Sequence, residues 1–130
     1  CNSAGNYNTF IGKLAGYATT ANNNTFIGAY SGKTNTTGSN NTFIGLCAGY
    51  YNTSGYDNVF IGRYSGYANT SGFRNMFIGL QAGRANTTGT DNSFIGHYAG
   101  RCNTTGSNNF FAGHCAGYCK TAGDNNELKF

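Results

Sequence analysis

The sequence predicts an all-β protein, a parallel β-solenoid (a β-roll or β-helix) of about seven coils with 17 residues each. Three observations lead to this prediction. The motif Phe-Ile-Gly recurs first after 16 residues and then after every 17 residues, and the series closes with a degenerate Phe-Ala-Gly. The 130 residues include 21 glycines and no proline. Aromatic residues, all of them Phe or Tyr, make up 15% of the chain, whereas disordered segments are poor in them.

The repeats define a single solenoid domain over residues 1–130. Each unit begins with Asn at position 1, continues through a short apolar run, Gly, Ala-Gly and an Asn-Thr-Thr-Gly turn, and ends with a polar pair at positions 16 and 17. Coils begin at residues 8, 24, 41, 58, 75, 92 and 109. Residues 1–7 match the end of a preceding coil, and residues 126–130 match a degenerate start of another. The single 16-residue coil lacks a turn residue, which we place between Ala18 and Thr19.

The period and its glycines favour strands over helices. A period of 17 is too short for paired-helix repeats, and no apolar pattern at i, i+3 and i+4 accompanies it. The short apolar runs between Gly and Asn clusters are typical of one strand per coil. Parallel strands stack about 4.8 Å apart, so equal positions of successive coils lie above one another in a rod about 34 Å long.

Stacking creates two adjacent apolar columns, Phe at position 3 and Ile at position 4. Neighbouring strand residues point to opposite sides, so both columns cannot face one thin interior. We expect Ile to lie inside, with the small residues of position 8, and Phe to form an exposed stripe for association. The alternative is a wider coil that encloses Phe and presents Ile to a partner. The candidate core and assembly columns are Phe10, Phe26, Phe43, Phe60, Phe77, Phe94 and Phe111, and Ile11, Ile27, Ile44, Ile61, Ile78 and Ile95.

A third column consists of threonine at position 13. Stacked hydroxyl groups can donate hydrogen bonds along the column and cap turns, which gives the column a structural role. A regular threonine array also resembles that of ice-binding solenoids, so ice binding is a second functional hypothesis. The column comprises Thr19, Thr36, Thr53, Thr70, Thr87, Thr104 and Thr121.

The units resemble the head repeats of trimeric autotransporter adhesins, whose Asn-Ser-x-Ala-Ile-Gly coils form left-handed parallel β-rolls. They are still more similar to the Asn-Thr-x-Ile-Gly and Asn-Thr-Thr-Gly repeats of bacterial and phage surface-fibre proteins. The match covers residues 2–126. The resemblance implies a structural or adhesive module in an extracellular or cell-surface filament. Its expected partners are copies of itself, held through an apolar column, with surface glycans as a further candidate because tyrosines line the coils.

Composition argues against several other functions. Four acidic residues are present, and none pairs with a histidine in one coil, so neither an enzyme nor a cofactor is expected. Eight scattered Lys and Arg give a net charge of +4 without a basic run, so nucleic acid is not an expected partner. No apolar stretch approaches the roughly 20 residues of a transmembrane helix.

Histidine and cysteine offer two candidate sites. His97 and His114 share position 6 of neighbouring coils and are the candidate metal ligands, with two surface histidines as the plain alternative. Cys102 and Cys119 share position 11 of adjacent coils, within reach of a disulfide. Cys1 is a candidate for a cross-link to Cys119 of another copy in a head-to-tail filament.

Asparagine sequons recur at position 12. Glycosylation is one interpretation and turn chemistry is the other, because repeating Asn-Thr-Thr creates sequons automatically. The candidate glycosylation sites are Asn35, Asn52, Asn69, Asn86 and Asn103.

Overall fold

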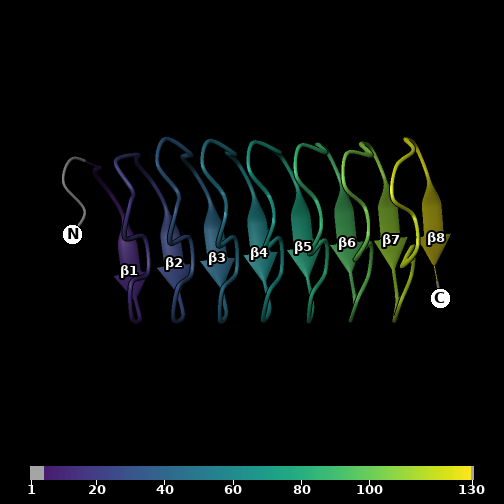
Figure 1. The fold of residues 1–130 in the computed structure, drawn as a ribbon, viewed down its shortest axis with the longest axis horizontal. Coiled ribbons are helices and arrows are strands. Elements are labelled where there is room, and N and C mark those ends of the chain that lie inside the picture. The colour runs from purple at the N-terminus through teal and green to yellow at the C-terminus, as the bar shows by residue number, and fades with distance from the viewer. Residues whose placement is uncertain (1–4, 130) are drawn as a thin grey trace.

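The structure, a computed structural model, describes residues 5–129, and the chain forms a rod of stacked coils (Figure 1). The strands are β1 (Thr9–Ile11), β2 (Thr25–Ile27), β3 (Thr42–Ile44), β4 (Val59–Ile61), β5 (Met76–Ile78), β6 (Ser93–Ile95), β7 (Phe110–Ala112) and β8 (Glu127–Lys129). They form one eight-stranded sheet in the order β1 to β8, and every neighbouring pair is parallel. The predicted all-β parallel solenoid is confirmed, and the described residues contain no helix.

Equal repeat positions lie beside one another in the sheet. Phe43 pairs with Phe60, and Ile44 pairs with Ile61. All the remaining neighbouring strands pair in the same register. The 16-residue coil keeps this register, because its missing residue lies in a turn outside the strands. The ladder is therefore set by the repeat period, as the sequence predicts.

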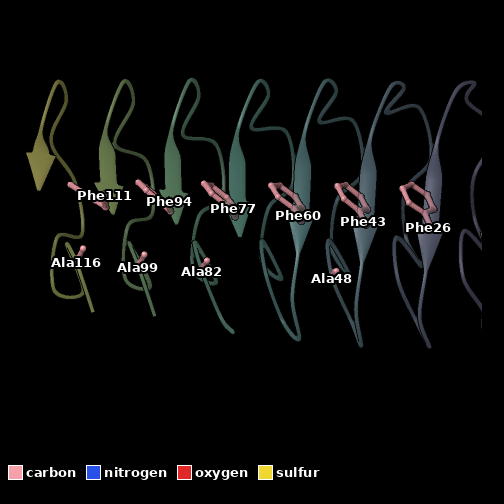
Figure 2. Close-up of a cluster of buried hydrophobic side chains, with 10 residues drawn as sticks. All are labelled: Phe26, Phe43, Ala48, Phe60, Phe77, Ala82, Phe94, Ala99, Phe111 and Ala116. Atoms are coloured by element: carbon pink, nitrogen blue, oxygen red, sulfur yellow. The ribbon is translucent and has the colours of Figure 1, made fainter. Parts of the chain in front are cut away.

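The Phe column lies inside the coils (Figure 2). The Ile column is half-buried or exposed on the outside of the sheet, so the expectation that Ile lies inside is wrong. Phe26, Phe43, Phe60, Phe77, Phe94 and Phe111 are all fully buried. From Phe26 onward, successive ring centroids lie 4.7–4.9 Å apart and the planes deviate by at most 8°. This offset stacking matches the coil spacing.

Glycine at position 9 makes room for the rings. A Cβ atom on Gly49 would lie 2.5 Å from the ring of Phe43 in the same coil. Gly49 also has a φ of 58°, which favours glycine. Because the wall opposite Phe43 lacks a side chain, a narrow coil can enclose a flat aromatic ring. The small residues of position 8, such as Ala48 and Ser65, are buried as expected, but they share the interior with Phe rather than with Ile.

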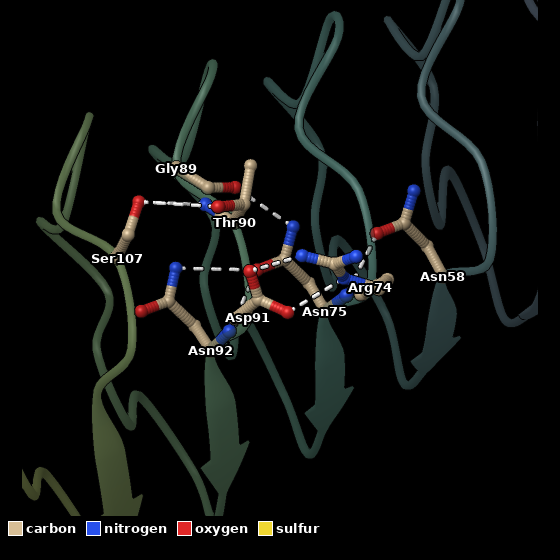
Figure 3. A network of polar contacts seen from close by, with 8 residues as sticks. All are labelled: Asn58, Arg74, Asn75, Gly89, Thr90, Asp91, Asn92 and Ser107. Atoms are coloured by element: carbon tan, nitrogen blue, oxygen red, sulfur yellow. Dashed lines mark hydrogen bonds and ion pairs between the residues drawn. The ribbon is translucent and has the colours of Figure 1, made fainter.

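Two columns of buried asparagine complete the interior. At position 1, Asn75 Nδ2 donates to the carbonyl of Gly89 (2.8 Å) and closes its own coil (Figure 3). Asn75 Oδ1 accepts from the backbone N–H of Asn92 in the next coil (3.0 Å). At position 12, Asn69 Nδ2 donates to Asn52 Oδ1 (2.7 Å). Each of these amides therefore joins two coils, so hydrogen bonds hold the polar part of the interior together.

The 16-residue coil is shortened at a different place from the one predicted. The backbone N–H of Thr19 donates to the carbonyl of Gly16, which is the turn bond that Asn35 makes in the next coil. The N–H and hydroxyl of Thr20 both donate to the carbonyl of Thr36. Thr19 thus takes the asparagine position and Thr20 the threonine position, and the missing residue is position 14. Thr19 Oγ1 is buried without a hydrogen-bond partner.

Candidate functional site

The outer face of the sheet is the candidate association surface. Side chains of positions 2 and 4 flank the buried Phe and point away from the interior. Ile11 and Ile95 are 59% and 39% exposed, and the other isoleucines of the column are half-buried. We call this surface the outer sheet face; its central part comprises Thr25, Thr42, Val59, Met76 and Ser93 with Ile27, Ile44, Ile61, Ile78 and Ile95.

The threonine column forms hydrogen bonds between coils. Thr36 Oγ1 donates to the carbonyl of Thr53 (3.0 Å), and Thr53 Oγ1 donates to the carbonyl of Thr70 (3.0 Å). Thr70, Thr87 and Thr104 repeat the bond toward the next coil. The hydroxyl groups therefore donate to the backbone of the next coil, as the structural interpretation predicts. The column runs from Thr20 rather than Thr19.

The two histidines lie next to each other on the surface. The ring centroids of His97 and His114 are 6.2 Å apart, and both side chains are exposed. Cys115 Sγ lies 3.9 Å from Nε2 of His114. Within residues 5–129, no group of three or more His, Cys, Asp or Glu side chains is arranged to hold a metal ion. The two rings lie side by side in neighbouring coils with their planes tilted by 45°, and metal binding by this pair stays a prediction.

The described cysteines carry free thiols. Cys47, Cys102, Cys115 and Cys119 form no disulfide. Cys102 and Cys119 occupy equal positions of adjacent coils, where the N–H of Cys102 donates to the carbonyl of Tyr118. Their disulfide is not confirmed and stays a prediction for oxidising conditions. Cys1 lies outside the described residues, so its predicted cross-link to another copy stays a prediction too.

The position-12 sequons are not accessible in the folded chain. Asn35, Asn52, Asn69, Asn86 and Asn103 are buried, and the Nδ2 atom of each, where a glycan would be attached, donates hydrogen bonds inside the rod. Predicted glycosylation at these five residues is therefore wrong for the folded protein. An N-glycan needs a surface amide. The sequon asparagines Asn23 and Asn40 are exposed on the turns that precede the strands.

Cations and tyrosines gather on the turns that follow the strands. Lys33 Nζ lies 5.2 Å from the ring centroid of Tyr50 and donates to its hydroxyl (3.0 Å), which raises the pKa of Lys33. Arg101 Nη1 donates to the hydroxyl of Tyr118 (2.8 Å). We call the row of these cations the basic edge. The basic edge comprises Lys13, Lys33, Arg63, Arg84 and Arg101.

The basic edge is not apparent as a run of charge in the sequence, because its residues lie far apart along the chain. Counted by repeat position, however, Lys13 and Arg63 share position 6, and Lys33, Arg84 and Arg101 share position 10. The stacked coils bring these positions together. The signal was present in the repeat alignment rather than in any local run of charge.

The asparagine ladders were also missed, although position 1 is Asn in every coil. A polar residue that never varies within a repeat indicates a buried hydrogen-bonded column.

Comparison with known proteins adds no relative to these observations. No protein-family model, no curated protein and no solved structure matches this chain. The coiled architecture is consistent with the β-roll of the fibre repeats that the units resemble, and membership of a particular adhesin or fibre family remains a proposal. Residues 5–129 include no helix of the length and apolar character that crossing a membrane requires.

Proposed function

We propose that this chain is a non-catalytic structural or adhesive module of an extracellular fibre, and that copies associate through the outer sheet face. The observation that carries the proposal is the Ile column. It repeats at every coil from Ile11 to Ile95 and is only half-buried, whereas the Phe and Asn columns are buried inside the rod. An apolar stripe of this length is typical of an association surface.

The size of the stripe sets the expected strength of association. Three residues of a strand span about 10 Å and seven strand spacings span about 34 Å, so the flat face covers about 340 Å² per partner. Stable complexes bury about 800 Å² per partner. Association of single copies through this face is therefore weak, and it strengthens when several such faces act together.

Sedimentation velocity over a concentration series tests this proposal. We expect reversible self-association of the unmodified chain at high concentration. The double variant Ile44→Lys and Ile78→Lys places two charges on the outer sheet face and abolishes association. Ser54→Lys with Thr88→Lys is the matched control, because these exposed residues lie in the same two coils away from the face. Monomer at every concentration, or equal loss in the control, would sink the proposal.

Ice binding through the threonine column is the second candidate. Its support is the regular spacing of exposed side chains such as Thr36 and Thr53. Each hydroxyl donates its proton to the next coil, so only acceptor lone pairs face water. We therefore expect no thermal hysteresis. A clear hysteresis that is lost in Thr53→Val would replace the fibre proposal with ice binding.

A further inference from the structure

Positive and negative charge are separated on the rod. Five of the eight Lys and Arg residues form the basic edge, on the turns that follow the strands. No acidic residue occupies positions 6–11 of any coil. Asp57, Asp91 and Asp124 lie on the turns that precede the strands, and Glu127 lies on β8. The basic edge therefore carries charge that no carboxylate of its own turns neutralises.

Tyrosines hold these cations in place. Arg63 lies 5.1 Å from the ring centroid of Tyr64, and Arg84 lies 5.5 Å from that of Tyr67. Arg101 also donates to Gln81 Oε1 (2.8 Å). Ring faces attract cations without cancelling their charge. The side chains are thus ordered before any ligand arrives, which lowers the entropy lost on binding.

Arg74, on the turns that precede the strands, differs from the cations of the basic edge in having a carboxylate partner. Its Nε and Nη2 atoms donate to the two carboxylate oxygens of Asp91 at 2.7 and 2.8 Å (Figure 3). Hydrogen bonding by Arg74 lowers the pKa of Asp91. This guanidinium group already has an anionic partner, whereas the contacts of Arg84 and Arg101 within residues 5–129 are with aromatic rings and neutral oxygens.

The shape of the edge favours a linear ligand. The cations extend from the coil of Lys13 to the coil of Arg101, five coil spacings or about 24 Å away. A row on protruding turns suits a polymer with a charge on each unit. The central ring faces are not free to stack nucleic-acid bases, because Tyr67 contacts Tyr51 and Tyr64 edge to face and also lies beneath Arg84.

We propose that the basic edge binds an anionic polysaccharide, a chain of sugars that carries carboxylate or sulfate groups. The arginines donate paired N–H groups to these anions, and the tyrosine rings beside Arg63 and Arg84 hold the two guanidinium groups in position for these contacts. This ligand goes beyond the proposed fibre role and does not depend on self-association, because the basic edge and the outer sheet face occupy different positions of the repeat.

Binding titrations with defined polymers test the assignment. Dextran sulfate and polygalacturonate represent the sulfate and carboxylate forms, and neutral dextran is the uncharged control. We expect at least one polyanion to bind, with an affinity that falls as salt rises, and no binding of neutral dextran. Arg84→Gln weakens binding several-fold, and removing Arg84 and Arg101 together lowers the slope of log affinity against log salt by about 2.

Arg74→Gln is the matched control, since it makes the same chemical change on the opposite turns and leaves polyanion binding unchanged. Equal loss in Arg74→Gln and Arg84→Gln would mean that net charge alone causes binding, and it would overturn the assignment. Equal binding of neutral dextran would overturn it as well. Tighter binding of a single-stranded oligonucleotide than of either polyanion would assign the edge to nucleic acid instead.

Discussion

Phe60 and Ile61 are neighbours in β4, and both belong to columns that repeat through the rod, yet their surroundings differ completely. Phe60 is fully buried, and its ring stacks on Phe43 and Phe77 at 4.8 and 4.9 Å. Ile61 is half-buried on the outer sheet face. The difference arises across the coil, where Gly66 leaves space for a ring. Both the buried column and the column on the outer sheet face therefore repeat regularly, and the glycine opposite the ring identifies the buried one.

Charged substitutions at Phe60 and Ile61 should give the largest difference in stability between the two columns. Phe60→Asp removes a stacked ring and buries a carboxylate, so we expect the free energy of unfolding to fall by at least about 4 kcal/mol. The lesion also interrupts stacking toward both ends of the rod. Ile61→Asp leaves its carboxylate in water and should cost about 1 kcal/mol. Urea unfolding followed by circular dichroism measures both losses, and similar values would contradict the assignment of inside and outside.

Substitutions in the Asn column and in the Thr column should also differ in their effect on stability, but by a smaller amount. Asn69→Ala leaves Oδ1 of Asn52 and an N–H of Asn86 without their partners, so we expect a loss of about 2–3 kcal/mol. Thr70→Val should cost about 0.5–1 kcal/mol, because the carbonyl of Thr87 still accepts three backbone N–H groups. Thermal and urea unfolding of the two variants give the comparison. A larger loss in Thr70→Val would show that the asparagine column is not an interior support.

The strand register could be predicted from the sequence, whereas the direction of the side chains could not. A strict period places Phe43 on Phe60 whatever the coil looks like in cross-section. Which of Phe and Ile lies inside depends on Gly49, six residues further along and across the coil. A contact of this kind follows from the path of the turns, and the repeat pattern alone does not specify that path.

The candidate sites show the same limit of prediction from sequence. Asn52 looks like a turn residue or a sequon within its own repeat, and its burial appears only when the coil closes over it. The gap in the short coil was misplaced because Thr19 and Thr20 are identical neighbours. Sequence identity cannot say which of them occupies the asparagine position. The hydrogen bonds of Thr20 to the carbonyl of Thr36 decide it.

One interior column can be extended by a single substitution. Asn103 Oδ1 is buried without a hydrogen-bond partner, because Lys120 occupies position 12 of the next coil. In Lys120→Asn, the new Nδ2 donates to Asn103 Oδ1, as Asn103 Nδ2 does to Asn86 Oδ1. We expect the free energy of unfolding to rise by about 1 kcal/mol. Lys120→Gln is the control, since its longer side chain removes the same charge but does not fit the ladder. Equal stability of the two variants would contradict this prediction.

The smallest expected effect is a difference in stability between substitutions at two surface leucines. Leu14 and Leu46 are both 38% exposed, but Leu14 has a φ of 55° and Leu46 does not have a positive φ. A left-handed backbone disfavours leucine and is tolerated by asparagine, so Leu14→Asn should raise the free energy of unfolding by about 0.5–1 kcal/mol. Leu46→Asn loses the same kind of exposed apolar side chain without relief of the backbone, so we expect it to change stability by less than about 0.5 kcal/mol. The difference between the two urea midpoints reports the backbone contribution, because the two leucine side chains are equally exposed. If Leu14→Asn is no more stable than Leu46→Asn, the left-handed conformation at position 7 does not limit the stability of the rod.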